Sequence, residues 1–183
     1  LLELINAKEY PEFIELLTQF SVDLFQQWKW SEPGSPYVSN CVYYVLHLWS
    51  RLIASLPYLK PGADSRLEQH APRVTKAYLD SRLEIARLAL DGSADDPLEE
   101  RDMLMEQLDV IPSLARCEFE SIAEYLLQQI DPRMGLYAEC TNMLRMQQLT
   151  PDLLRKKKLL ESELAWLTYM VGAIINGRSS STQ

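Results

Sequence analysis

Few residues in this chain are of the kinds that enzymes use as metal ligands or nucleophiles. Its 183 residues include two histidines, His47 and His70, and three cysteines. Neither histidine lies in an HExxH motif or at metal-ligand spacing from a cysteine. A GxSxG motif, a Walker-type loop and a Rossmann glycine fingerprint are also missing from the sequence. The sequence therefore predicts no enzyme, no catalytic residue, no metal site and no cofactor.

The cysteines and the apolar runs limit the compartment. Cys41, Cys117 and Cys140 are odd in number, far apart and set in apolar helical patterns, so we expect buried, reduced thiols in the cytosol or nucleus. The longest apolar stretch, residues 165–175, is interrupted by Thr168 and Gly172 and has about half of the roughly 20 residues that a membrane span needs. We expect a buried helix there and no membrane insertion.

Positive charge is scarce. The chain has 18 Lys and Arg residues against 26 Asp and Glu residues, a net charge of −8 and a pI of about 4.8. Nucleic-acid affinity comes mainly from Lys and Arg that neutralise phosphates, so the balance opposes a nucleic-acid partner and favours a basic protein partner.

Amphipathic helices fill the chain. Between Tyr37 and Pro57 the apolar residues recur at three- and four-residue steps, which places them on one helix face. A first helix is expected from about Glu9 to Trp28, with Phe13, Leu17, Phe20, Leu24 and Trp28 directed inward. No strand-like alternation of comparable length is present, so the predicted fold class is all-α.

Proline and glycine breaks divide the helices into pairs. We expect one block of repeats over residues 1–183, with helical hairpins at 9–57, 72–131 and 132–177, and the start of a flexible loop at 178–183. The third boundary rests on the Asp131–Pro132 pair. Hairpins at intervals of roughly 40 to 60 residues favour a HEAT- or armadillo-like α-α superhelix over tetratricopeptide repeats. A closed helical bundle has the same periodicity and remains the alternative.

Particular strings resemble a family. They are YVLHLWSRLIASLPYLK (44–60), VTKAYLDSRLE (74–84), DDPLEE (95–100), ARCEFE (115–120) and WLTYMVGAIINGR (166–178). In this order they look like a middle stretch of the exportin-7 family, Ran-dependent receptors of the importin-β superfamily. The chain begins at Leu1 rather than at a methionine, which also leads us to expect a piece of a longer protein.

The resemblance implies a receptor that carries protein cargo through nuclear pores. Ran-GTP, folded and often basic cargo and nuclear pore proteins would be its partners, and it would move between the cytoplasm and the nucleus. A general HEAT-repeat scaffold in a regulatory complex is the alternative function, and a small helical-bundle enzyme is a third.

Two charged segments stand out. The segment from 91 to 102 contains six carboxylates against Arg101 alone, and we interpret it as a possible partner-binding acidic loop that attracts basic surfaces, or else as a solvated connector. Its carboxylates are Asp91, Asp95, Asp96, Glu99, Glu100 and Asp102. Residues 155–158 (RKKK) are interpreted as solvent-facing charge at the start of a helix, or else as a basic recognition patch or nuclear-localisation-like string.

Overall fold

The described part of the chain consists of six long helices. The computed structural model describes residues 3–29, 36–94, 96, 101–146 and 149–176. The helices are α1 (Tyr10–Trp28), α2 (Pro36–Ala54), α3 (Leu67–Leu90), α4 (Arg101–Cys117), α5 (Phe119–Arg145) and α6 (Pro151–Asn176), with short 3-10 helices at Leu4–Asn6 and Leu56–Tyr58. Those residues contain no strand, and none of their helices is long and apolar enough to cross a membrane. The all-α prediction is confirmed.

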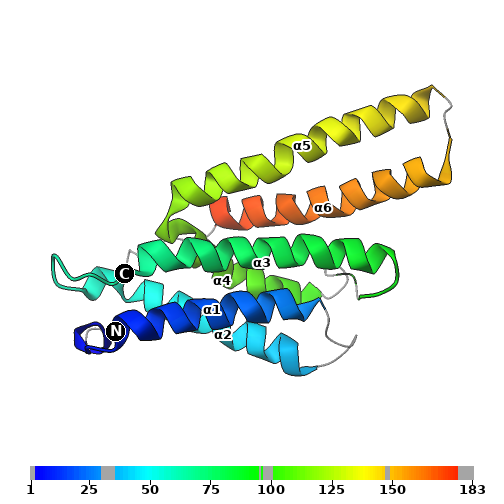
Figure 1. Cartoon of the computed structure of the whole chain (residues 1–183). Coiled ribbons are helices and arrows are strands. Elements are labelled where there is room, and N and C mark those ends of the chain that lie inside the picture. Colours follow the sequence, from blue (N-terminus) through cyan, green and yellow to red (C-terminus); the bar gives the residue numbers. More distant parts are fainter. Residues whose placement is uncertain (1–2, 30–35, 95, 97–100, 147–148, 177–183) are drawn as a thin grey trace.

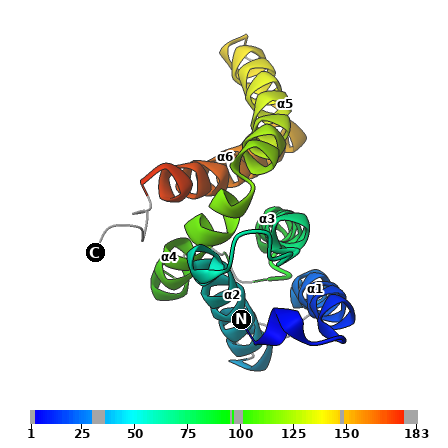
Figure 2. The ribbon, with the colours of Figure 1, turned by 90° about the vertical axis from the view of Figure 1, so that its left-hand side faces the viewer.

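The helices form three antiparallel hairpins stacked in two layers. Helices α1, α3 and α5 make one layer, and α2, α4 and α6 make the other (Figures 1 and 2). Each hairpin packs on the next, through α1 on α3, α2 on α4 and α4 on α6. Within the residues described, the first and last helices do not touch. The fold is therefore an open helical-repeat stack and not a closed bundle.

Helix α3 is the centre of the stack, because it packs on α1, α4, α5 and α6. Its buried Tyr78 lies edge-on to Phe25 and Trp166, and its hydroxyl donates to Gln107. The buried Arg82 guanidinium lies 3.4 Å from the centre of the Trp28 ring and donates to Gln107 Oε1 at 2.7 Å. Stacking over an aromatic face compensates part of the cost of burying this charge, so one aromatic and polar cluster ties α1, α3, α4 and α6 together.

The buried face of α1 is only partly the expected one. Trp28 is buried and Leu17 and Leu24 are partly buried against the core, but Phe13 and Phe20 are 42% and 55% exposed. Thr18 and Ser21 face the core as well. Both hydroxyls donate to carbonyls one turn earlier, and the Ser21 hydroxyl also accepts from the Trp49 indole at 2.9 Å. A satisfied hydroxyl can occupy a core position, so counting apolar residues alone missed part of the buried face.

The expected helix break at Asp131–Pro132 is also wrong, because α5 runs through Pro132 from Phe119 to Arg145. The boundary between the second and third hairpins lies instead between Cys117 and Phe119. A proline inside a helix removes one backbone hydrogen bond at a cost of about 3 kcal/mol. Packing against α6 along its length offsets this cost, and Arg133 adds a side-chain bond to the Gln129 carbonyl at 2.8 Å.

The cysteine prediction holds in part. Cys140 is buried and Cys117 is partly buried, where burial and the nearby Glu68 and Glu118 carboxylates raise the pKa of the Cys117 thiol to about 11. Cys41 is exposed, contrary to expectation, because it lies on the face of α2 that no other described helix covers.

Candidate partner-binding surfaces

The acidic loop is only partly described. Asp95, Glu99 and Glu100 lie outside the described residues, as do residues 178–183, so the structure does not test those predictions. Asp91 follows the last residue of α3, and Gly92 has a φ of +73°, a left-handed conformation that suits glycine after a helix end. Asp96 is half-buried and Asp102 is exposed in the first turn of α4.

Asp91 is paired within the chain. Its carboxylate forms an ion pair with Arg155, the first residue of the basic run at 155–158. The two charged segments that the sequence presents separately, one acidic and one basic, therefore meet where α3 ends and α6 begins. A basic partner would therefore have to compete with Arg155 for Asp91.

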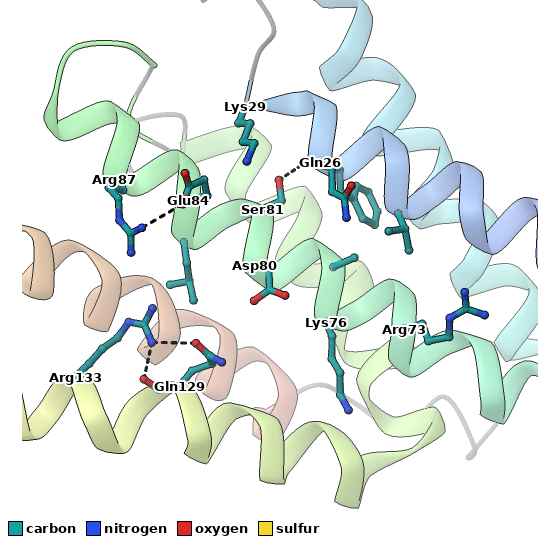
Figure 3. Close-up of a pocket in the computed structure, with 14 residues that line it drawn as sticks. Gln26, Lys29, Arg73, Lys76, Asp80, Ser81, Glu84, Arg87, Gln129 and Arg133 are labelled. Carbon is teal, nitrogen blue, oxygen red and sulfur yellow. Dashed lines mark hydrogen bonds and ion pairs between the residues drawn. The ribbon is translucent and has the colours of Figure 1, made fainter.

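A groove with five basic residues in its lining lies between α1, α3 and α5. Its volume is about 610 Å³, and its rim carries Lys29 from the end of α1, Arg73, Lys76 and Arg87 from α3, and Arg133 from α5. Figure 3 shows these side chains around the space between α3 and α5, with Asp80 among them. Apolar side chains, including Phe25 and Leu83, also line the groove.

The cations of this groove differ in their partners. Arg133 donates to the buried carboxylate of Glu163 at 2.8 Å, and Arg87 reaches the same carboxylate at 3.4 Å. Arg87 also pairs with Glu84 at 3.4 Å, and Arg73 pairs with Glu15 at 3.0 Å. Lys76 donates to the neutral hydroxyl of Ser121 at 3.0 Å and lies over the Tyr125 ring. Two arginines thus share one buried carboxylate, and Lys76 has a neutral hydrogen-bond partner, which leaves the groove able to attract anions.

The groove continues towards α6. Two further cavities, of about 640 and 370 Å³, lie where α3 ends and α6 begins, and Arg87 lines both the first groove and the smaller of these two. We call the Lys and Arg residues along the three cavities the basic band: Lys29, Arg73, Lys76, Arg87, Arg133, Arg155, Lys156 and Lys158.

Sequence reasoning singled out only residues 155–158 of the basic band and interpreted them as solvent-facing charge. The other residues of the basic band lie on or next to three different helices and are far apart in the sequence. They form no continuous basic run that sequence analysis could detect. One signal was available: Arg73, Lys76, Asp80, Glu84 and Arg87 recur at three- and four-residue steps, which places them on one polar face of α3.

Apolar side chains are exposed at both ends of the stack. On α1 they are Phe13, Leu16 and Phe20, on α2 Tyr37, Tyr44 and Leu48, and on α5 Leu127, Met134, Leu136 and Met143. Interior hairpins of a repeat stack bury such faces on their neighbours. Among the described residues, no group of His, Cys, Asp or Glu could hold a metal ion.

Comparison with known proteins gives a consistent result. Residues 84–183 match the family model "Exportin-7-like, TPR domain". The chain is 36% identical over 178 residues to Exportin-7-A of Xenopus laevis and 33% identical over 180 residues to Ran-binding protein 17 of Homo sapiens. These alignments cover 97% and 98% of the chain but 15% of each relative. Exportin-7 of Dictyostelium discoideum is 24% identical over 179 residues. No solved structure matches the chain.

The stacked hairpins and the family match define the class: the chain is a helical-repeat solenoid of the nuclear transport receptor type. More specifically, it belongs to the exportin-7 family and spans about 15% of the length of the relatives to which it was compared. The resemblance seen in the sequence is confirmed. The family description names a TPR domain. One tetratricopeptide repeat has about 34 residues, and the hairpin of α3 and α4, from Leu67 to Cys117, is longer than that.

Proposed function

We propose that this chain is a section of a nuclear transport receptor that, over its whole length, binds Ran-GTP and folded protein cargo and carries that cargo through nuclear pores. Such a receptor would interact with nuclear pore proteins and move between the cytoplasm and the nucleus. The observation that carries the proposal is the continuous alignment of 97% of the chain with Exportin-7-A and of 98% with Ran-binding protein 17. The role is that of a binding protein and not of an enzyme.

The architecture supports a binding role. Each hairpin contacts only the next one, so small rotations between neighbours add up along a long solenoid and let it adapt to large, folded partners. The polar cluster around Tyr78 and Arg82 would hold neighbouring hairpins in a fixed relation at the centre of this section.

The acidic loop at 91–102 is our candidate for contact with basic surfaces on Ran or cargo. Clustered charge of one sign speeds encounter with the opposite sign more than it adds affinity. The candidate residues are Asp91, Asp95, Asp96, Glu99, Glu100 and Asp102, and of these Asp91 also forms an ion pair with Arg155.

The decisive experiment measures binding of the full-length receptor to Ran loaded with GTP or GDP. The transport role predicts that binding is much tighter with GTP. Equal binding to the two forms, or none, would favour the alternative of a general helical-repeat scaffold.

The acidic loop is tested separately by reversing Asp95, Asp96, Glu99 and Glu100 to Lys in that receptor. The association rate with Ran-GTP or basic cargo should fall, and the difference should shrink once salt brings the Debye length below about 8 to 10 Å. Reversing Glu3, Glu9, Glu12 and Asp23, four exposed carboxylates on or near α1, is the matched control. Unaltered kinetics at low salt would make the loop a connector only.

A further inference from the structure

The basic band is an exception in an acidic chain. The three cavities contain eight of the chain's 18 Lys and Arg residues but only four of its 26 Asp and Glu residues. The chain as a whole carries a net charge of −8, so positive charge is concentrated along one edge of α3. Clefts lined by one sign of charge focus the field and raise the local concentration of oppositely charged ligands.

We propose that the basic band is a binding site for an acidic polypeptide segment of a partner protein, one that carries apolar residues between its carboxylates. This role is independent of the proposed binding of Ran and of basic cargo, because it requires the opposite charge on the partner.

The contacts of the cations support an anionic ligand. Lys76 donates to the neutral Ser121 hydroxyl, and the Tyr125 hydroxyl donates to Asp80, which engages the carboxylate nearest to Lys76 along α3. The arginines of the band already have carboxylate partners: Arg87 and Arg133 share Glu163, Arg87 also pairs with Glu84, Arg73 pairs with Glu15, and Arg155 pairs with Asp91. The carboxylate of a bound ligand could therefore accept hydrogen bonds from Lys and Arg side chains of the basic band, whose positive charge exceeds the negative charge of the chain's own carboxylates around it.

The lining favours a polypeptide over a nucleic acid. Val22 and Ala77, which are partly exposed, offer apolar surface in the first groove, and Leu154 and Leu159 offer it near α6. The carboxylates of Asp80 and Glu84 lie among the cations and would repel a continuous phosphate backbone, as would the net negative charge of the chain. A polypeptide can avoid these positions by placing an apolar or polar residue opposite each of them.

The test uses fluorescence anisotropy on the full chain with three labelled probes of equal length: a peptide of Glu and Leu, the same peptide with Gln at every Glu, and a single-stranded RNA. The Glu-containing peptide should bind, the Gln version should bind much more weakly, and the RNA should bind less tightly than the acidic peptide. Preferential binding of RNA, equal binding of the two peptides, or no binding of the acidic peptide would each overturn the proposal.

Variants then locate the site. Lys29→Glu with Lys76→Glu should weaken binding of the acidic peptide by about tenfold at low salt, and the loss should shrink as salt rises. Arg51→Glu with Lys60→Glu makes the same charge change at exposed residues outside the band and should have much less effect. An equal loss in both double variants would mean general charge attraction and would overturn the site.

A conservative variant separates charge from structure. Lys76→Arg keeps the charge while changing the bond to Ser121, so it should bind the peptide nearly as tightly as the parent chain. Far-ultraviolet circular dichroism and denaturant midpoints show whether each variant is folded. If Lys76→Arg, when folded, lost binding as fully as the charge reversal, the charge explanation would be wrong.

Discussion

Helices α3 and α5 are similar in length, 24 and 27 residues, and each contains a proline, yet their surroundings differ sharply. Thirteen residues of α3 are buried, including Arg82 and His70, whereas α5 buries Ile122, Leu126 and Cys140. The difference does not follow from composition, because α5 exposes five large apolar side chains, Phe119, Leu127, Met134, Leu136 and Met143. In a repeat stack, burial depends on whether a hairpin has neighbours on both sides, and among the described helices α3 has them while α5 does not.

The largest expected effect comes from the same substitution made in the two helices. Leu79→Ala in α3 removes a side chain that is 1% exposed and should destabilise the chain by about 2 to 5 kcal/mol, because it leaves a cavity. Leu127→Ala in α5 removes a side chain that is 57% exposed and should change stability by less than about 0.5 kcal/mol. Urea unfolding followed by circular dichroism measures both. Equal losses would show that α5 is packed as firmly as α3.

A smaller effect is expected at the ion pairs that connect α3 and α5 through α6. Glu163 is buried and pairs with Arg133 and Arg87, so Glu163→Gln leaves the Arg133 guanidinium without this carboxylate and leaves Arg87 with Glu84 alone. Because Arg87 is about half exposed and can be hydrated, we expect a loss of about 1 to 3 kcal/mol.

The control for this pair is Glu161→Gln on the same helix. Glu161 pairs with Lys157 one turn earlier and is solvent-exposed, a kind of pair that adds little stability. If Glu163→Gln were as mild as Glu161→Gln in the same unfolding assay, the buried carboxylate would not contribute to holding α5 against the rest of the stack.

A pH-dependent effect is expected between α1 and α3. The buried His70 Nδ1 lies 2.9 Å from Thr18 Oγ1, and burial lowers the pKa of His70, with Arg73 and Arg66 acting in the same direction and Glu15 opposing them. The unfolded chain therefore binds more protons than the folded chain just below pH 6.5, and stability falls as the pH falls through that range.

His70→Gln isolates this contribution. The parent chain should lose more stability than the variant between about pH 7 and pH 5, by no more than about 1.4 kcal/mol per pH unit. Unfolding curves at several pH values measure the difference, and carboxylates that titrate in both proteins cancel. Parallel pH profiles would mean that His70 takes up a proton without cost to the fold.

The sequence predicts the helical class, the number of hairpins and the burial of Trp28, because these depend on periodicity and on large apolar side chains. It mispredicts part of the buried face of α1, because Thr18 and Ser21 become core residues only when a helix carbonyl, His70 or Trp49 is present to satisfy their hydroxyls.

The same limit applies to Pro132 and to the basic band. Whether a helix continues through proline depends on the packing that offsets the lost hydrogen bond, which for α5 is supplied by α6. The band depends on the stacking of three hairpins, which brings Lys76, Arg133 and Arg155 along one edge of α3. The residues next to Pro132, or next to each cation of the basic band, do not reveal how the helices pack, and both predictions require that packing.

The smallest effect on stability is expected at the exposed apolar face of α1, where Leu16 is 63% and Phe20 is 55% exposed. Leu16→Ser with Phe20→Ser should change the unfolding free energy of this chain by less than about 1 kcal/mol, since each surface change contributes about 0.5 kcal/mol or less. Its effect should appear in association instead. Contiguous exposed apolar residues favour contact between copies, so the parent chain should self-associate at high concentration and the double variant should do so less.

Light scattering across a concentration series measures this association. Glu12→Ser with Gln19→Ser, also on exposed positions of α1, changes polar residues and should leave association unaltered. A parent chain that stays monomeric at high concentration would show that an apolar helix face without a neighbouring helix does not by itself cause self-association. If the apolar variant and the polar control reduced association equally, the contact between copies would not depend on burying the apolar side chains of α1.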